Sequence, residues 1–171
     1  ACLLDLSTGG TCIVPNGLMA TQTITSDIFN GVSVASTVRF TNSKITVTAT
    51  SIMPNNTTVE CDGSEGWQIS GDKTVFYNSS NATPTFLLAG GVDKVTNCNF
   101  EPVGATTSTG GHLKVSGPQP SIIGNTIKGK QYAIDVTGFL PDQFKLIGNY
   151  LLSTGDKIHY DVGGALTVPG W

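Results

Sequence analysis

Apolar and polar residues alternate in short stretches, and two of these stretches recur along the second half of the chain. The first is an alternating phrase at 112–117, 133–138 and 159–163. The second is an isoleucine–glycine–asparagine phrase at 123–127 and 147–151. Strict alternation predicts short β-strands, and no segment shows the sustained period of 3.6 that a helix requires. We therefore predict short strands separated by glycine and asparagine corners.

The spacing of these phrases is nearly constant. The three copies of the first phrase align on Val115, Val136 and Val162, and the two isoleucine phrases begin at Ile123 and Ile147. A recurrence of about 20–26 residues is typical of solenoids, whose windings contact only their neighbours. Stacked windings would place alternate apolar residues in two inward columns, which contain Leu113 and Val115, Ile134 and Val136, and Tyr160 and Val162.

Two further patterns fit this recurrence. Phe100, Ile127 and Leu151 occupy matching places in successive windings. Threonines alternate at 21–25 and again at 46–50, so stacking in step would place Thr23 opposite Thr48. Alternating threonines suit one face of a strand, and these segments therefore predict two rows of hydroxyl groups on stacked strands.

Asparagines recur at one expected corner of the winding. Asn125 and Asn149 hold matching places in the two isoleucine phrases. An asparagine accommodates left-handed backbone, and its amide can bond to the copy in the next winding. The alternative is that both are ordinary turn residues.

The composition narrows the class of protein. The 171 residues predict a single domain over 1–171, with terminal caps at 1–20 and 163–171. Only 12% of residues are charged, which favours a folded, turn-rich β-protein. The net charge of −3 gives no basic stripe for nucleic acid. No apolar run reaches the length of a membrane span.

Cysteines and sequons indicate an extracellular or virion-surface setting. The four cysteines allow three pairings, and their spacing does not suggest a zinc site or any other metal site. An even number of cysteines in a chain of low charge favours an oxidising compartment. The disulfide candidates are Cys2, Cys12, Cys61 and Cys98, and the glycosylation candidates are Asn55, Asn56, Asn78 and Asn81.

One outer face could carry chemistry. If the valine columns point inward, their neighbours point outward, namely His112, Lys114, Asp135, His159 and Asp161. On this alignment Asp135 and Asp161 are one winding apart, so the two carboxylates could act as general acid and base or bind a hard cation such as Ca²⁺. A lysine beside them could neutralise a substrate carboxylate. The alternative is a solvated ladder in which Lys114 and Asp135 form a weak surface pair.

Two surface features suggest ligands. Trp67 and Tyr132 could stack on sugar rings, since an aromatic face is flat and apolar. The two threonine rows leave ice binding as a minor alternative, although threonine is also simply a good strand residue. Packing is an equally ordinary role for the aromatic residues.

The order of motifs resembles the pectate-lyase-like right-handed parallel β-helix superfamily. The likeness lies in four segments, at Gly9–Gly17, Pro54–Gly63, Val95–Phe100 and Ser121–Leu151. It implies an all-β, right-handed parallel β-helix of roughly 5–7 turns with little or no helix. The superfamily includes lyases, hydrolases, phage tailspikes and adhesins. Its enzymes usually carry a denser set, such as several aspartates with an arginine, whereas Arg39 is the single arginine here.

The sequence therefore favours a structural module over an enzyme. We expect an extracellular or virion-surface β-helix that self-assembles, binds surface polysaccharide, or does both, without a complete active site or a cofactor. The alternative is a polysaccharide lyase or glycoside hydrolase that uses the outer face, and Ca²⁺ would enter only in the lyase case.

Overall fold

The computed structural model describes residues 8–14, 22–41, 43–62, 74–78, 83–103, 110–138 and 144–161. Its strands form three sheets, here called A, B and C, and every neighbouring pair of strands is parallel. Sheet A contains β1 (Gly10–Val14), β3 (Ser36–Thr41), β6 (Thr58–Asp62), β9 (Lys94–Thr96), β12 (Ser121–Ile123) and β15 (Lys145–Ile147). Sheet B contains β2 (Gln22–Ile24), β4 (Lys44–Val47), β7 (Val75–Asn78), β10 (Asn99–Pro102), β13 (Thr126–Lys128) and β16 (Tyr150–Leu152). Sheet C contains β5 (Ser51–Met53), β8 (Phe86–Leu88), β11 (Gly111–Val115), β14 (Tyr132–Thr137) and β17 (Ile158–Asp161).

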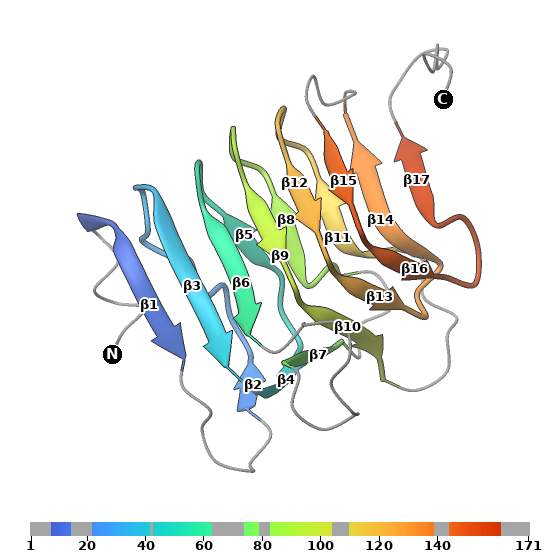
Figure 1. Cartoon of the computed structure of the whole chain (residues 1–171), viewed down its shortest axis with the longest axis horizontal. Helices are drawn as coiled ribbons and strands as arrows, with labels where there is room; N and C mark the ends of the chain where they lie inside the picture. The colour runs from blue at the N-terminus through green and yellow to red at the C-terminus, as the bar shows by residue number, and fades with distance from the viewer. Residues whose placement is uncertain are drawn as a thin grey trace.

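The chain visits the sheets in the order A, B, C and then begins the next winding. The result is a parallel β-solenoid of about five turns with essentially no helix, as the sequence predicts. Figure 1 shows the windings stacked along the long axis, with β1 at one end and β17 at the other. In the described residues, no helix is both long and apolar enough to cross a membrane.

The register confirms most of the predicted stacking. Leu113 pairs with Ile134 and Val115 with Val136, as the first two copies of the alternating phrase predict. The second phrase is also aligned as predicted, since β12 pairs with β15 and Ile123 lies opposite Ile147. The column of Phe100, Ile127 and Leu151 is confirmed as well.

The third copy of the first phrase is shifted by two positions from the prediction. Val136 lies opposite Tyr160 rather than Val162, and Ile134 lies opposite Ile158. The sequence alignment matched Asp135-Val136 to Asp161-Val162 because the residue pair is the same. In the structure the partners of Asp135 and Val136 are His159 and Tyr160, two positions earlier. A shift of two preserves the alternation of a strand, so it still placed apolar residues inward.

The threonine rows are also shifted by two positions. The sequence predicts Thr23 opposite Thr48, whereas Thr23 lies opposite Thr46. The next residue in this row is Tyr77, so the threonine row does not continue into the next winding. Among the described residues, the row therefore consists of Thr23 and Thr46.

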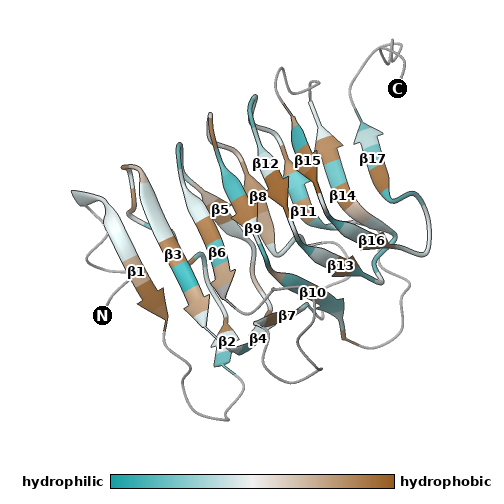
Figure 2. Ribbon diagram, in the orientation of Figure 1, coloured by the Kyte–Doolittle hydropathy of each residue, from teal (hydrophilic) through white to brown (hydrophobic). Residues whose placement is uncertain are grey.

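Aromatic rings fill the middle of the core. Phe76 stacks on Phe100 with centroids 5.3 Å apart, and it meets Phe40 and Phe86 edge to face at 5.2 and 5.1 Å. All four rings are buried. Apolar and polar segments alternate along the strands (Figure 2), which is the pattern expected when one face of each strand lines a core. The alternation that predicted strands therefore also builds the interior.

One corner of the solenoid is held by a disulfide and then by asparagines. Cys61 and Cys98 form the disulfide, and Cys12 is disulfide-bonded as well. The backbone N–H of Cys98 donates to Oδ1 of Asn125 at 2.9 Å, and the backbone N–H of Asn125 donates to Oδ1 of Asn149 at 2.9 Å. The predicted amide contact between asparagines is thus confirmed.

The backbone at this corner differs from the prediction in one respect. Left-handed φ angles belong to Gly124 (68°) and Gly148 (62°), which precede the asparagines, and to Asn97 (61°) in the earlier winding. Glycine adopts this conformation without steric cost. Asn125 and Asn149 are therefore placed for hydrogen bonding, and the residue before each one makes the bend.

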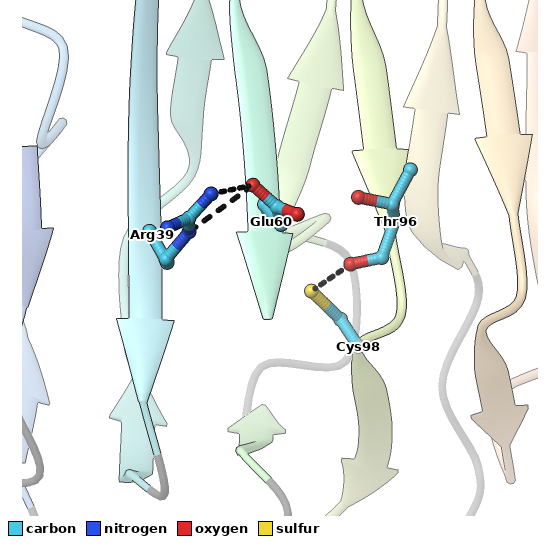
Figure 3. A network of polar contacts seen from close by, with 4 residues as sticks. All are labelled: Arg39, Glu60, Thr96 and Cys98. Carbon is cyan, nitrogen blue, oxygen red and sulfur yellow. Dashed lines mark hydrogen bonds and ion pairs between the residues drawn. The ribbon is translucent and has the colours of Figure 1, made fainter. Parts of the chain in front are cut away.

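Figure 3 shows two polar contacts, one between neighbouring windings of sheet A and one within a winding at the end of β9. Arg39 on β3 pairs with Glu60 on β6 at 2.9 Å, in a partly exposed position where such a pair contributes little stability. Sγ of Cys98 lies 3.2 Å from the carbonyl oxygen of Thr96. Because this sulfur is bonded to Cys61, it carries no proton, and the approach is a packing contact.

Candidate functional site

The outer face of sheet C brings several polar side chains into one row. In the register of this sheet, Ile52, Leu87, Lys114, Asp135 and His159 follow one another from winding to winding. Parallel strands are spaced about 4.8 Å apart, so the row runs along the solenoid axis as a linear track. We call the group formed by Lys114, Asp135, His159 and Tyr132 the sheet C cluster.

An aspartate and a histidine form the centre of the cluster. Nδ1 of His159 lies 2.8 Å from Oδ1 of Asp135. An ionised carboxylate only accepts hydrogen bonds, so Nδ1 of His159 carries the proton and Nε2 is left as the second ring nitrogen. The side chains are 31% and 15% exposed for His159 and Asp135. The pair is therefore oriented by contact but remains reachable from solvent.

Tyr132 completes the cluster by stacking on the histidine. The two ring centroids are 4.1 Å apart and the ring planes differ by 7°. Tyr132 begins β14, and its partner in the preceding winding is Gly111, which has no side chain. The sequence named Tyr132 as a platform for sugar rings; its ring instead shares one face with His159.

Lys114 is the neighbour of Asp135 in the register, but the predicted surface pair between them does not form. The ion pairs found in the described residues join Arg39 to Glu60, Lys128 to Glu101 and His159 to Asp135. Lys114 is only partly buried, on the track beside Leu87. Its charge is thus available to an anionic group that contacts this face.

Two residues expected beside Asp135 on this face are placed differently. His112 is buried, and its Nε2 is 2.9 Å from the carbonyl oxygen of Lys128. Burial and the nearby charge of Lys130 outweigh this hydrogen bond and lower the pKa of His112 to about 3, so it is a neutral interior residue. Asp161 lies opposite Thr137 because of the shift in register, so the predicted contact between Asp135 and Asp161 is wrong.

The other candidate residues divide between described and undescribed positions. Asn55 and Asn56 are exposed, whereas Asn78 is buried with its Nδ2 bonded to backbone and hydroxyl oxygens, which does not fit a glycan at that position. Trp67, Cys2 and Asn81 lie outside the described residues, as do the caps expected at 163–171 and at most of 1–20. In the described part of the chain, no three His, Cys, Asp or Glu side chains gather as a metal site would require.

Two buried charged groups were not foreseen from the sequence. Asp93 accepts hydrogen bonds from the backbone N–H groups of Gly90 and Thr57 at 2.7 and 3.3 Å, and burial nevertheless raises its pKa to about 6. Lys130 is also buried, and loss of hydration lowers its pKa to about 8. Both follow corner segments, where composition alone does not distinguish a buried charge from a solvated one.

The fold and this cluster define a class, the parallel β-solenoid with a polar track along one sheet. Comparisons of the chain with protein-family models, curated proteins and solved structures found no significant match. Function must therefore be argued from the geometry of the chain itself.

Proposed function

We propose that the protein is a structural β-solenoid module that binds polysaccharide along the outer face of sheet C. The observation that carries this proposal is the stacked pair of Tyr132 and His159 beside Asp135 and Lys114, a lysine without an ion pair among the described residues. Sugar rings are recognised by flat aromatic faces together with a few fixed polar groups. A track that runs along the axis suits an extended polymer better than a compact ligand.

Binding to an immobilised uronic-acid polymer and to its neutral methyl ester tests this proposal. Loss of an aromatic contact is worth about 0.5–1.5 kcal/mol, so Tyr132→Ala should weaken binding to both polymers by roughly 2- to 12-fold. Lys114→Ala should weaken binding to the acid more than to the ester, because only the acid offers carboxylates. Lys145→Ala on β15 is the matched control, since Lys145 is exposed on sheet A.

If the immobilised polymers retain the wild type and the Tyr132→Ala, Lys114→Ala double variant equally, the proposed binding face is refuted. If binding weakens with rising ionic strength but is unaffected by Tyr132→Ala, the protein is held by non-specific electrostatic attraction and not by recognition of sugar rings.

A second candidate, a polysaccharide lyase, is favoured by the hydrogen bond between His159 and Asp135. With Nδ1 held by the carboxylate, Nε2 can remove the proton next to a uronate carboxylate while Lys114 neutralises that carboxylate. The assay is the appearance of unsaturated sugar products. Asp135→Asn and His159→Gln should each abolish such activity, and activity that survives both would exclude this assignment.

Self-association is the other part of the proposal, and the last winding supports it. The inward side chains Leu146, Leu151 and Ile158 are only half-buried, whereas their partners one winding earlier are fully buried. Ile147 and Tyr150 are also 57% and 60% exposed on the same winding. A second copy could cover this apolar end and pair with its strand edges. Light scattering over a concentration series tests it: Tyr150→Asp should lower the association, and a wild type that stays monomeric would refute it.

The setting that we propose is extracellular or virion-surface. The disulfide between Cys61 and Cys98 is compatible with this location, because such bonds persist in oxidising compartments. We also propose membership of the pectate-lyase-like right-handed β-helix superfamily, for which the parallel solenoid and the corner asparagines are the supporting features. Intact mass of natively produced protein, with and without reduction, tests the setting; free thiols in that material would argue against it.

A further inference from the structure

A buried lysine and a buried asparagine converge on one backbone oxygen inside the solenoid. Lys130 follows β13, and its Nζ donates a hydrogen bond of 2.9 Å to the carbonyl oxygen of Thr83. Asn78 ends β7, and its Nδ2 donates to the same oxygen at 3.0 Å. The two nitrogens are therefore near neighbours. Lys130 is 1% exposed and Asn78 is 2% exposed, so bulk water is excluded from both.

Two buried phenylalanines lie close in sequence to Asn78 and Thr85, and no described residue forms an ion pair with the lysine. Phe76 lies two positions before Asn78 on the same strand, and Phe86 lies on the strand that follows Thr85, whose hydroxyl also accepts from Asn78 at 3.1 Å. Lys130 is not among the lysines that form ion pairs in the described residues. Burial lowers its pKa to about 8, so the uncharged amine, which is the nucleophilic form, is far more accessible than in an ordinary lysine.

We propose that Lys130 and Asn78 form an intramolecular isopeptide cross-link. Nζ of Lys130 attacks Cγ of Asn78, so that a bond forms between Nζ and Cγ and the bond from Cγ to Nδ2 breaks. One proton of the amine passes to the departing Nδ2, which leaves as ammonia. The product is a secondary amide, and the step requires no oxidant, reductant or second reactant.

A buried hydrogen-bond acceptor is present in the same interior. His112 is buried, its ring lies 5.8 Å from that of Phe100, and the charge of Lys130 is close enough to affect its titration. Nε2 of His112 contacts the carbonyl oxygen of Lys128, which fixes the proton there and leaves Nδ1 as an acceptor. Among the described residues, this Nδ1 has no hydrogen-bond partner. Such an acceptor can hydrogen-bond an uncharged amine without taking its proton, because the pKa of the ring is about 3.

The cross-link would join windings that are not adjacent. β7 and β13 are both strands of sheet B, and β10 lies between them. A bond from Asn78 to Lys130 therefore encloses an entire winding. It would act with the disulfide between Cys61 and Cys98, which ties the two windings that contain β6 and β9. A short solenoid would gain a covalent clamp around its aromatic core.

Mass spectrometry of the folded, then reduced and denatured wild type tests the proposal. The intact mass should be lower than the sequence mass by one molecule of ammonia. Trypsin should fail to cleave after Lys130, and peptide 74–94 should be recovered joined to peptide 129–145. The peptide map is required because the Asn-Gly pairs at 16–17 and 30–31 can also lose ammonia by cyclising.

Variants separate the cross-link from other ammonia losses. Lys130→Arg and Asn78→Ala should each restore the full mass and the separate peptides. Lys128→Arg, two positions away and paired with Glu101 at the surface, is the matched control and should keep the deficit. Recovery of free peptide 74–94 and of cleavage after Lys130 from the folded wild type would overturn the proposal, and this result does not depend on how the variants fold. It would leave the polysaccharide-binding proposal untouched, because that rests on sheet C.

Discussion

His112 offers the sharpest test of how the core is packed, because a buried imidazole is destabilised when it takes up a proton. The imidazole projects from β11 and is buried with its Nε2 against the carbonyl oxygen of Lys128 at the end of β13, and its Nδ1 has no hydrogen-bond partner in the described part of the chain. A charge placed there would lose its hydration and meet the charge of Lys130. We therefore predict that acid destabilises the protein through this residue, and that His112→Gln removes that contribution.

The magnitude follows from the difference between the folded and unfolded states. The pKa of His112 falls from 6.5 to about 3 on folding, because burial and the charge of Lys130 outweigh its hydrogen bond. The folded state thus binds this proton less tightly than the unfolded chain does. The contribution is fully present above pH 6.5 and is lost as the pH falls toward 3. At about 1.36 kcal/mol per pH unit, the loss between pH 6.5 and pH 4 is about 3 kcal/mol.

The assay is urea denaturation of the wild type and His112→Gln at several pH values from 7 to 4. The measured quantity is the change in unfolding free energy with pH, so any constant cost of the substitution cancels. The wild type should lose about 3 kcal/mol more than the variant over this range. Parallel pH profiles for the two proteins would refute the conclusion that His112 is buried and neutral.

Three further predictions concern other interior residues. Burial raises the pKa of Asp93 from 3.8 to about 6, so its contribution to stability is lost as the pH rises through 6. Asp93→Asn should remove about 2 kcal/mol of this dependence between pH 4 and pH 7 in the same urea titration, and an unchanged profile would contradict it. Asn125→Ala leaves buried backbone groups of Cys98 and Val95 without partners and should cost about 1–3 kcal/mol for each group. Asn149→Ala in the half-buried last winding should cost less, and equal losses of unfolding free energy in urea would argue against the hydrogen bonds of the asparagine corner. Phe76→Ala should cost about 3–5 kcal/mol because it removes the central ring of the core, whereas Phe144→Ala, which is only partly buried, should cost clearly less by thermal or chemical denaturation.

Most of the architecture could be predicted from the sequence, because the windings of a solenoid place similar residues at a nearly regular spacing along the chain. Val115 and Val136 are aligned by sequence and by register alike, since the winding between them contains no long insertion. The alignment failed at Val162 because a shift of two positions keeps the alternation that defines a strand. Periodicity therefore reports which face a residue occupies more reliably than which residue is its neighbour.

The candidate site was only partly predictable for the same reason. Lys114 and Asp135 share a row as expected, but the next place in the row was predicted for Asp161 and is taken by His159. The pairing of His159 with Asp135 appears only in the correct register. His112 has the alternation of an outer residue and is nevertheless buried, with the last residue of β13 against it. Whether a corner folds over a side chain is decided by tertiary packing, which alternation along one strand does not encode.

The disulfide has a mechanical consequence for a coil pulled from its two ends. Cys61 and Cys98 are 37 residues apart, and a fully extended chain spans about 3.3–3.6 Å per residue. While this bond is intact, about 120–130 Å of contour length stays hidden, however completely the remaining windings unravel. In the Lys130→Arg variant, which lacks the proposed cross-link to Asn78, reduction would release that length as one added step in a force–extension trace, so the redox state of the disulfide sets how far the tethered variant can stretch.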